Sequence, residues 1–414
     1  MKFNSVVIVE AVRTAIGGFA GSLSALSPAQ MGTATALEVI KRSGVDAQQI
    51  DHAVYGHIIT TAAQDAYLAR HIALNAGLAE SSAAFNVNRL CGSGLQAVIS
   101  AAQMIEAGDS QLALAGGAES MSQGAYLLPK VRTGLRMGDG KIEDLTLGIL
   151  SDPFATGHMG MTAENIADQY AFTREQLDEF ALASHQKAAA AIESGRFTEQ
   201  IVPLVVTKGR EEVFFSHDEH VRPQVSMADL AKLKPAFKKD GLVTAGNASG
   251  INDGAATLLL ADAQTAARQG LKVRARLVAN AFSGVEPALM GMGPVVAVQK
   301  ALQQADLSVA DLDVIESNEA FAAQAMAVAQ ELKLPSERVN PNGGAVGMGH
   351  PVGATGAILT VKALYELERC NGRYALITLC IGGGQGIALI IERVTDAASA
   401  ALALSKPHKV ASAL

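Results

Sequence analysis

Short apolar runs alternate with glycine-rich turns along much of the chain, a pattern typical of buried β-strands separated by helices. The run at residues 6–9 predicts a first strand. Near the C-terminus, apolar residues at 375–379 and 387–391 flank a turn that is rich in glycine. They predict two neighbouring buried strands, because the glycines would interrupt a continuous helix.

A more polar segment lies between residues 121 and 240, where charged side chains are concentrated. Thr173 and Gln176 have the spacing of a helix N-cap and its capping-box partner, so we expect a helix from there to Ala191. We interpret the whole segment as a solvated, partly helical insertion between two better-buried parts of the chain.

The two parts that flank this insertion show the same order of features. Each has a helical segment, a strand, a Val-Asn pair before a glycine-rich turn and a helix, and then a strand that runs into glycines. The Val-Asn pairs are residues 87–88 and 339–340. This order predicts an α/β fold built from a duplicated unit, although two unrelated α/β segments can look alike in this respect.

The composition of the 414 residues, 49% hydrophobic and 18% charged, indicates a globular chain with a substantial core. The net charge of −7 argues against nucleic acid or an anionic membrane as a partner, but it allows a local basic contact with a phosphorylated ligand. The three cysteines are too few for a disulfide framework. Because the apolar start is too short for a signal peptide and glycines break the aliphatic stretch 374–391, we expect a cytoplasmic protein without a membrane partner.

Cys91 is the first residue that suggests chemistry. It lies in a turn of small residues between a predicted strand and a helix at 95–99. The free N–H groups at the start of a helix favour thiolate over thiol, and they predict a cysteine pKa in the range of about 3.5–7.5. The alternative is a buried cysteine that packs as a small hydrophobic residue.

His350 occupies the matching place in the second part, and Pro351 suits the first turn of a helix that begins there. A neutral imidazole can accept a proton from a thiol, although a loop histidine is more often structural.

Cys380 ends a predicted buried strand beside the glycine turn, whose N–H groups can stabilise an oxyanion; the alternative is a core cysteine. Cys370 suits a structural place at a helix end. Since duplicated halves bring equivalent loops together, we expect Cys91, His350 and Cys380 to meet.

Other common site motifs are incomplete. The Gly140-Lys141 pair is followed by Ile142, so it does not form a Walker A phosphate-binding loop. His217 and His220 resemble a metal-binding pair, but they lie in a charged stretch that we expect to be exposed. We therefore expect no metal site.

Four motifs follow one another along the chain: Asn-Arg-Leu-Cys-Gly-Ser-Gly at 88–94, Asn-Glu-Ala-Phe-Ala at 318–322, Gly-His-Pro at 349–351 and Cys-Ile-Gly-Gly-Gly at 380–384. Together they resemble those of the thiolases, which are acetyl-CoA acyltransferases, and the resemblance covers residues 5–394. It implies a thiolase fold, in which two duplicated α/β core domains form an αβαβα arrangement with an inserted loop domain. The corresponding division is an N-terminal core at 1–120 and 252–271, a coenzyme A-binding loop domain at 121–251, a C-terminal core at 272–394 and an Ala/Ser-rich tail at 395–414.

The resemblance also implies a role for each catalytic position. Cys91 would attack an acyl-CoA and hold the acyl group as a thioester, and His350 would activate it. Cys380 would move the proton at the α-carbon of the second acetyl-CoA. Asn318 would hold a water that completes one oxyanion site with His350, and the N–H groups of Cys91 and Gly382 would form the other. The expected activity is reversible Claisen condensation of two acetyl-CoA, or thiolysis of a 3-ketoacyl-CoA, with coenzyme A as substrate or product and no separate cofactor.

Acyl-CoA thioesters and coenzyme A are the expected ligands. The positions that the resemblance assigns to their binding are His158, Met159, Arg222, Phe237, Ser249, Met290 and Phe321. His158, Met159 and Met290 resemble the short-chain, acetoacetyl-CoA-forming thiolases. Residues 65–70 instead resemble β-ketothiolases that accept somewhat longer partners, so the preferred chain length stays open.

Two features depart from the family pattern. Ser317 stands before Asn318, where alanine is expected, and the Ala/Ser-rich tail from Thr395 lies outside the pattern and does not end in a peroxisomal signal.

The alternatives to a short-chain thiolase are a broader 3-ketoacyl-CoA thiolase, a ketoacyl synthase of the same broad fold, and a non-catalytic acyl-CoA-binding subunit. A ketoacyl synthase would have a Cys-His-His pattern instead of Cys380 as a second thiol. Relatives suggest a homotetramer or homodimer.

Overall fold

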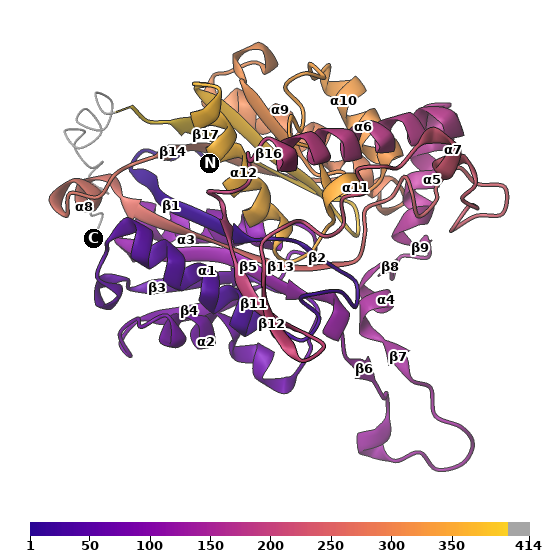
Figure 1. The fold of residues 1–414 in the computed structure, drawn as a ribbon, viewed down its shortest axis with the longest axis horizontal. Coiled ribbons are helices and arrows are strands. Elements are labelled where there is room, and N and C mark those ends of the chain that lie inside the picture. The colour runs from indigo at the N-terminus through magenta and orange to yellow at the C-terminus, as the bar shows by residue number, and fades with distance from the viewer. Residues whose placement is uncertain (396–414) are drawn as a thin grey trace, which may run out of the picture.

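The computed structural model describes residues 1–395, whose strands form a large mixed sheet made of two similar halves (Figure 1). The first half has the strand order β4-β3-β5-β13-β1, and the second has the order β15-β16-β17-β14. The strands of the first half are β1 (Val6–Thr14), β3 (His52–Gly56), β4 (Ala83–Val87), β5 (Leu112–Ser120) and β13 (Asn252–Asp262). Those of the second half are β14 (Ala275–Gly284), β15 (Val314–Ser317), β16 (Tyr374–Ile381) and β17 (Gln385–Arg393).

Strand pairing repeats from one half to the other. The pairs β3–β5 and β15–β16 are parallel, and in each half the next two pairs toward the middle of the sheet are antiparallel. The halves join through a short antiparallel contact between β1 and β14. The expected duplication of an α/β unit is therefore confirmed.

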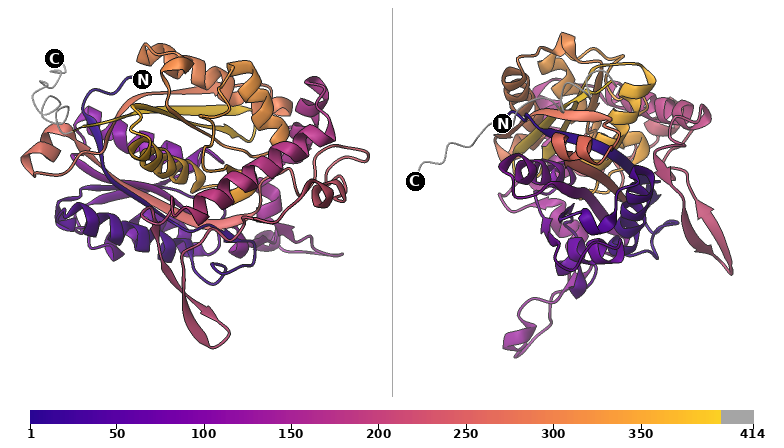
Figure 2. Two further views of the ribbon diagram at one scale, coloured as in Figure 1. Left: turned by 45° about the horizontal axis from the view of Figure 1, so that its top comes forward. Right: turned by 90° about the vertical axis from the view of Figure 1, so that its left-hand side faces the viewer.

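Helices form three layers around these strands (Figure 2). Helices α3 (Ser93–Ala107) and α12 (Thr355–Arg369) pack against each other between the two halves, and their apolar side chains belong to one buried cluster. Helices α1 (Pro28–Ser43) and α2 (Leu68–Asn75) cover the outer face of the first half, and α9 (Gly293–Ala305) covers that of the second. The expected αβαβα arrangement is confirmed.

The insertion between β5 and β13 carries its own short strands and helices beside the core (Figure 1). Its helix α6 (Arg174–Glu193) begins after Thr173, which forms the expected capping box with Gln176. The other strands and α-helices of the insertion are β6 (Tyr126–Leu127), β7 (Glu143–Asp144), α4 (Leu145–Ile149), β8 (Ser151–Asp152), β9 (Gly157–His158), α5 (Met159–Gln169), β10 (Ile201–Val202), β11 (Leu204–Lys208), β12 (Glu211–Phe215) and α7 (Met227–Ala231). The division into three domains with these boundaries stays a prediction.

The remaining elements are short or lie between the core strands. They are β2 (Gly17–Gly18), α8 (Ala263–Arg268), α10 (Ala322–Leu332), α11 (Ala345–Met348) and the 3₁₀ helices η1 (Ala47–Gln49), η2 (Ala63–Tyr67), η3 (Met121–Gln123), η4 (Val131–Thr133), η5 (Pro287–Met292) and η6 (Val309–Asp311). None of the helices within residues 1–395 is both long and apolar enough to span a bilayer. All of the predicted tail except Thr395 lies outside the described residues.

Two local expectations from the sequence are wrong. The helix after His350 does not begin at Pro351 but at Thr355, because the chain first forms a tighter turn in which the N–H of Ala354 bonds to the carbonyl three residues before it, that of Pro351. The stretch around His217 is not uniformly exposed either. Asp218 is fully buried, since its carboxylate accepts two hydrogen bonds from the Arg13 guanidinium, at 2.7 and 2.9 Å.

Candidate active site

Cys91 lies in a tight turn between β4 and α3. Leu90 has a left-handed backbone conformation, with φ of 46°, and Gly92 is the N-cap of the helix. A Cβ on Gly92 would come within 2.6 Å of the Ile381 side chain, so only glycine fits there without a shift of that neighbour. The turn therefore places the Cys91 thiol against the end of β16, which belongs to the other half of the molecule.

The environment of this thiol differs from what the sequence predicts. Burial raises the pKa of Cys91 to about 11, and the negative charge of Glu119 acts in the same direction. The N–H of Gly382 faces the sulfur and lowers the pKa, but by less. The expectation of a thiol acidified by the start of a helix is wrong, because the loss of water around Cys91 outweighs the nearby N–H groups. A base must therefore take its proton.

His350 is buried and has the properties of such a base. Burial lowers its pKa to about 4, so the imidazole is neutral near pH 7. Its Nδ1 lies 2.7 Å from the hydroxyl of Thr355, which donates its only hydrogen to the carbonyl of Pro351. The hydroxyl oxygen must then accept a hydrogen from Nδ1, and this leaves Nε2 as the unprotonated nitrogen. Nε2 lies 3.5 Å from the side-chain nitrogen of Asn318.

Asn318 and Cys380 complete the group. Asn318 directly follows β15, and its Oδ1 is buried with no hydrogen-bond partner among residues 1–395. Cys380 is fully buried near the end of β16, where burial and the nearby Cys91 both raise the pKa of its thiol. The strand ends and turns of the two halves therefore bring together the residues that the sequence predicts to meet.

A cavity of about 640 Å³ opens onto Cys91 and His350. Its lining includes ten of the twelve predicted site residues: Cys91, His158, Met159, Arg222, Phe237, Ser249, Met290, Phe321, His350 and Gly382. Asn318 and Cys380 lie outside the lining. The cavity thus connects the reactive groups with the positions that were expected to hold the ligand.

Comparison with known proteins identifies the family. Residues 6–264 match the family described as thiolase, N-terminal domain, and residues 271–393 match thiolase, C-terminal domain. The chain belongs to the thiolase family. The thiolase fold and the family resemblance predicted from the sequence are thereby confirmed, and the chain is an acyltransferase.

Relatives and solved structures share nearly the whole chain. Beta-ketothiolase BktB of Cupriavidus necator is 54% identical over 391 residues, which cover 94% of this thiolase and 99% of the relative. Acetyl-CoA acetyltransferase of Escherichia coli is 50% identical, with the same coverage. The crystal structure of Bacillus anthracis acetyl-CoA acetyltransferase has a TM-score of 0.92 at 46% identity, over 95% of this chain and 100% of that one. Human mitochondrial 3-ketoacyl-CoA thiolase in complex with CoA has a TM-score of 0.92 at 39% identity, over 94% and 98%.

Aromatic and sulfur-containing side chains form the inner wall of the thiolase cavity. Met159, Met290, Phe321 and Cys380 belong to one apolar cluster, against which Phe237 packs. The ring of Phe237 stacks on His158 at 4.5 Å between centroids and meets Phe321 edge-on at 6.2 Å. Burial lowers the pKa of His158, which favours its neutral form. The exposed Arg222 and the half-buried Ser249 line the same cavity.

Sequence reasoning missed several residues that support the site. Thr355 fixes the tautomer of His350, and Asn252 accepts a hydrogen bond from the His350 N–H at 2.9 Å. Glu119 accepts a hydrogen bond from the N–H of Gly353, in the loop that carries His350. Thr355 could have been noticed as a hydroxyl five residues after His350, but Asn252 and Glu119 are far from it in the sequence.

A second cleft, of about 830 Å³, contains none of the predicted site residues. It lies where the end of α1 meets α12 and the strands that join the halves. Arg274, at its wall, forms ion pairs with Glu10 and Glu368 and lies over the ring of Tyr365. The charges of Arg274, Glu10 and Glu368 therefore compensate one another at this wall.

Proposed function

We propose that this thiolase transfers acyl groups between coenzyme A thioesters through an acyl-enzyme on Cys91. The observation that carries the proposal is a neutral His350 with an unprotonated Nε2 on the cavity that also receives the Cys91 thiol. The thiol proton passes to Nε2, and the sulfur bonds to the carbonyl carbon of the substrate. The N–H groups of Cys91 and Gly382 stabilise the oxyanion that develops there.

The second thiol supplies the proton for the carbon–carbon step, which is simplest to follow in the direction of thiolysis. Cys91 attacks the 3-keto carbon, the bond between C2 and C3 breaks, and the Cys380 thiol protonates C2 to release acetyl-CoA. The incoming coenzyme A thiol then gives its proton to Cys380 and takes the acyl group, while Cys91 recovers its proton from His350. The raised pKa of Cys380 supports this role, because it keeps the group a neutral thiol that can act as an acid. Condensation is the reverse sequence.

Asn318 stabilises the enolate of acetyl-CoA in this scheme. With His350 it holds a water that donates a hydrogen bond to the thioester oxygen. The buried and unpartnered Asn318 Oδ1 supports a water at this place, since such an oxygen otherwise loses hydrogen-bonding free energy.

Coenzyme A occupies the outer part of the cavity, with the positive charge of Arg222 close to its phosphorylated nucleotide end. The acyl group lies against the bulky side chains of Met159, Met290 and Phe321, which favour a short chain. We therefore expect acetoacetyl-CoA to be the best substrate for thiolysis. A broader range remains the alternative, because both acetyl-CoA acetyltransferases and a beta-ketothiolase are close relatives.

The thiolase works as a homodimer or homotetramer in this proposal. Large apolar side chains are exposed along the arm at residues 126–144, which extends from the core (Figure 1): Tyr126, Leu127, Leu128, Val131, Leu135, Met137 and Ile142. Exposed apolar side chains grouped in this way mark protein contacts. Light scattering of the purified protein measures the state directly, and a monomer would contradict this part. A cytoplasmic location stays a prediction.

Thiolysis of 3-ketoacyl-CoA substrates of increasing chain length, with free coenzyme A, tests the proposal. Acetoacetyl-CoA should be the best substrate, with a steep fall for longer chains; equal rates for longer chains would favour the broad β-ketothiolase. Cys91→Ser should abolish acyl-enzyme formation, seen by mass spectrometry of the intact protein, and should leave the circular dichroism spectrum unchanged. Undiminished turnover by this variant would refute Cys91 as the nucleophile.

A further inference from the structure

The second Val-Asn pair of the duplicated unit has no part in the chemistry described above. Its asparagine, Asn340, is buried in a turn between α10 and α11 and has a left-handed backbone conformation, with φ of 44°. In the first half the corresponding Asn88 accepts a hydrogen bond from the N–H of Leu90, in the turn that leads to Cys91.

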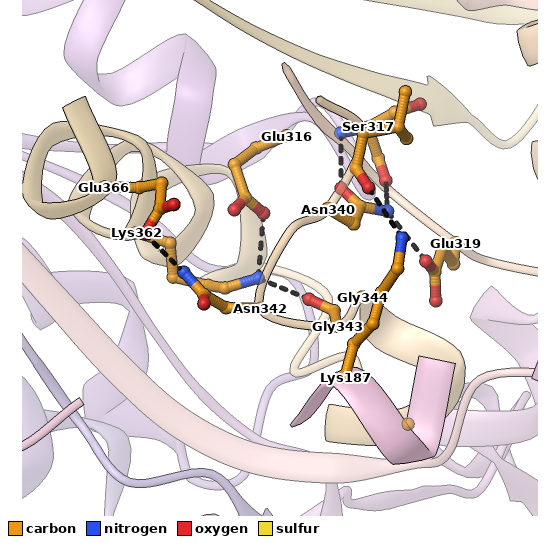
Figure 3. Close-up of polar contacts among 12 residues, drawn as sticks. Lys187, Glu316, Ser317, Glu319, Asn340, Asn342, Gly343, Gly344, Lys362 and Glu366 are labelled. Atoms are coloured by element: carbon orange, nitrogen blue, oxygen red, sulfur yellow. Dashed lines mark hydrogen bonds and ion pairs between the residues drawn. The ribbon is translucent and has the colours of Figure 1, made fainter. Parts of the chain in front are cut away.

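The side-chain amide of Asn340 contacts the backbone immediately before Asn318 and the side chain immediately after it (Figure 3). Its Oδ1 accepts a hydrogen bond from the N–H of Ser317 at 2.9 Å. Its Nδ2 donates to the carbonyl of Ser317 at 2.8 Å and to the carboxylate of Glu319 at 2.7 Å. Three hydrogen bonds of one small amide are thus directed at the two neighbours of Asn318.

Glu319 extends this arrangement to the insertion. Its other carboxylate oxygen accepts hydrogen bonds from the hydroxyl of Ser184 on α6, at 2.6 Å, and from the N–H of Val346, at 3.2 Å. A Cβ on Gly344 would lie 2.1 Å from the carboxyl carbon of Glu319, so the turn approaches this carboxylate as closely as a glycine allows. The segment that contains Asn318 therefore cannot move independently of the turn at Asn340.

A buried ion pair ties the same turn to the helix that orients His350. Lys362, on α12, bonds to Glu316 at 2.8 Å and to the carbonyl of Gly343 at 2.7 Å (Figure 3). Thr355, at the start of α12, holds Nδ1 of His350. Asn318 and His350, which must share one water in the proposed mechanism, are therefore fixed from a common helix.

The geometry points to Asn340 as a positioning residue for Asn318. This inference rests on the proposed function. Asn340 does not line the cavity; it holds the backbone of Ser317, before Asn318, and the carboxylate of Glu319, after it, so that the amide of Asn318 stays within reach of Nε2 of His350. Loss of these hydrogen bonds should slow condensation, because that step needs the enolate site formed by Asn318 and His350. Acetylation of Cys91 uses the oxyanion site formed by the N–H groups of Cys91 and Gly382, so its rate should change little.

The two half-reactions can be measured separately by rapid quenching. One experiment follows acetylation of Cys91 by acetyl-CoA, and the other follows acetoacetyl-CoA formation when the acetylated protein is mixed with acetyl-CoA. Asn340→Gly removes the amide and tolerates the left-handed backbone. We expect it to slow condensation by about tenfold or more, since small misplacements can cost up to about a hundredfold, and to change acetylation by less than about threefold.

Asn342→Ala is the matched control, because it removes a buried amide from the same turn. Asn342 bonds to Glu366 and Arg196 instead of the segment at 317–319, so its loss should leave the ratio of the two rates unchanged. Asn340→Ser removes the amide without placing a second carboxylate beside Glu319, and it replaces the glycine variant if that variant does not fold. Folding of every variant is checked by thermal unfolding.

A double-mutant comparison gives a second criterion. In an Asn318→Ala background, Asn340→Gly should add no further loss of condensation, because its effect passes through Asn318. Equal slowing of both half-reactions, or full additivity with Asn318→Ala, would overturn the inference. A wild-type protein that is not acetylated at all would instead refute the proposed function.

Discussion

Replacement of Thr355 by valine tests whether the Thr355 hydroxyl keeps Nε2 of His350 unprotonated. Valine keeps the shape of threonine but removes the oxygen that accepts the hydrogen of His350 Nδ1 at 2.7 Å. Thr355 and His350 are both buried, with 2% and 5% of their surfaces exposed, so water does not simply replace the lost acceptor. The imidazole can avoid an unpaired N–H by moving its proton to Nε2, but that tautomer cannot accept the proton of Cys91.

The size of the effect follows from the cost of a buried, unpaired donor, which is about 1–3 kcal/mol. At about 1.4 kcal/mol for each factor of ten, this lowers the population of the working tautomer between roughly fivefold and a hundredfold. Acetylation of Cys91 should slow by a similar factor, with little change in the affinity for acetyl-CoA.

The assay is the rate of Cys91 acetylation by saturating acetyl-CoA. Thr355→Ser should restore most of the rate, because it returns the hydroxyl. Thr360→Val is the matched control, since Thr360 is fully buried on the same helix, and within residues 1–395 its hydroxyl bonds only to the carbonyl of Gly356. If Thr355→Val acetylates as fast as Thr360→Val, the assignment of the proton to Nδ1 is refuted.

Two further predictions concern the second thiol and a buried charge cluster. Cys380→Ser should still accept an acetyl group on Cys91 but lose most condensation; normal condensation would show that another group moves the α-proton. Burial alone would lower the pKa of His57, but the carboxylates of Asp65 and Glu119 raise it to about 10. The stability that protonated His57 contributes is complete below its unfolded pKa of about 6.5 and is lost as the pH rises to about 10. His57→Asn should therefore destabilise the protein to urea most at pH 6 and least at pH 10, and a pH-independent difference would contradict this.

Local sequence signals determine much of the fold. The capping box at Thr173 and Gln176 defines a helix start from residues three apart, and the glycine turn between β16 and β17 needs the left-handed conformations of Gly383 and Gly384. The repeated order of strands and helices predicts the duplication, and duplication brings Cys91 and His350 to one cavity. These features depend on neighbours along the chain, and so they can be recognised from the sequence.

Tertiary structure decides the electrostatics and the fine positioning of the site. The sequence suggests an acidic Cys91, yet burial by the second half raises its pKa, because desolvation depends on everything packed around the sulfur. Likewise, Asp218 looks exposed in a charged stretch but is buried by a bidentate ion pair with the distant Arg13. Asn340 acquires its role from contacts with Ser317, more than twenty residues earlier in the chain. The sequence by itself determines which groups are present and which turns carry them, whereas their protonation and orientation come from long-range packing that excludes water.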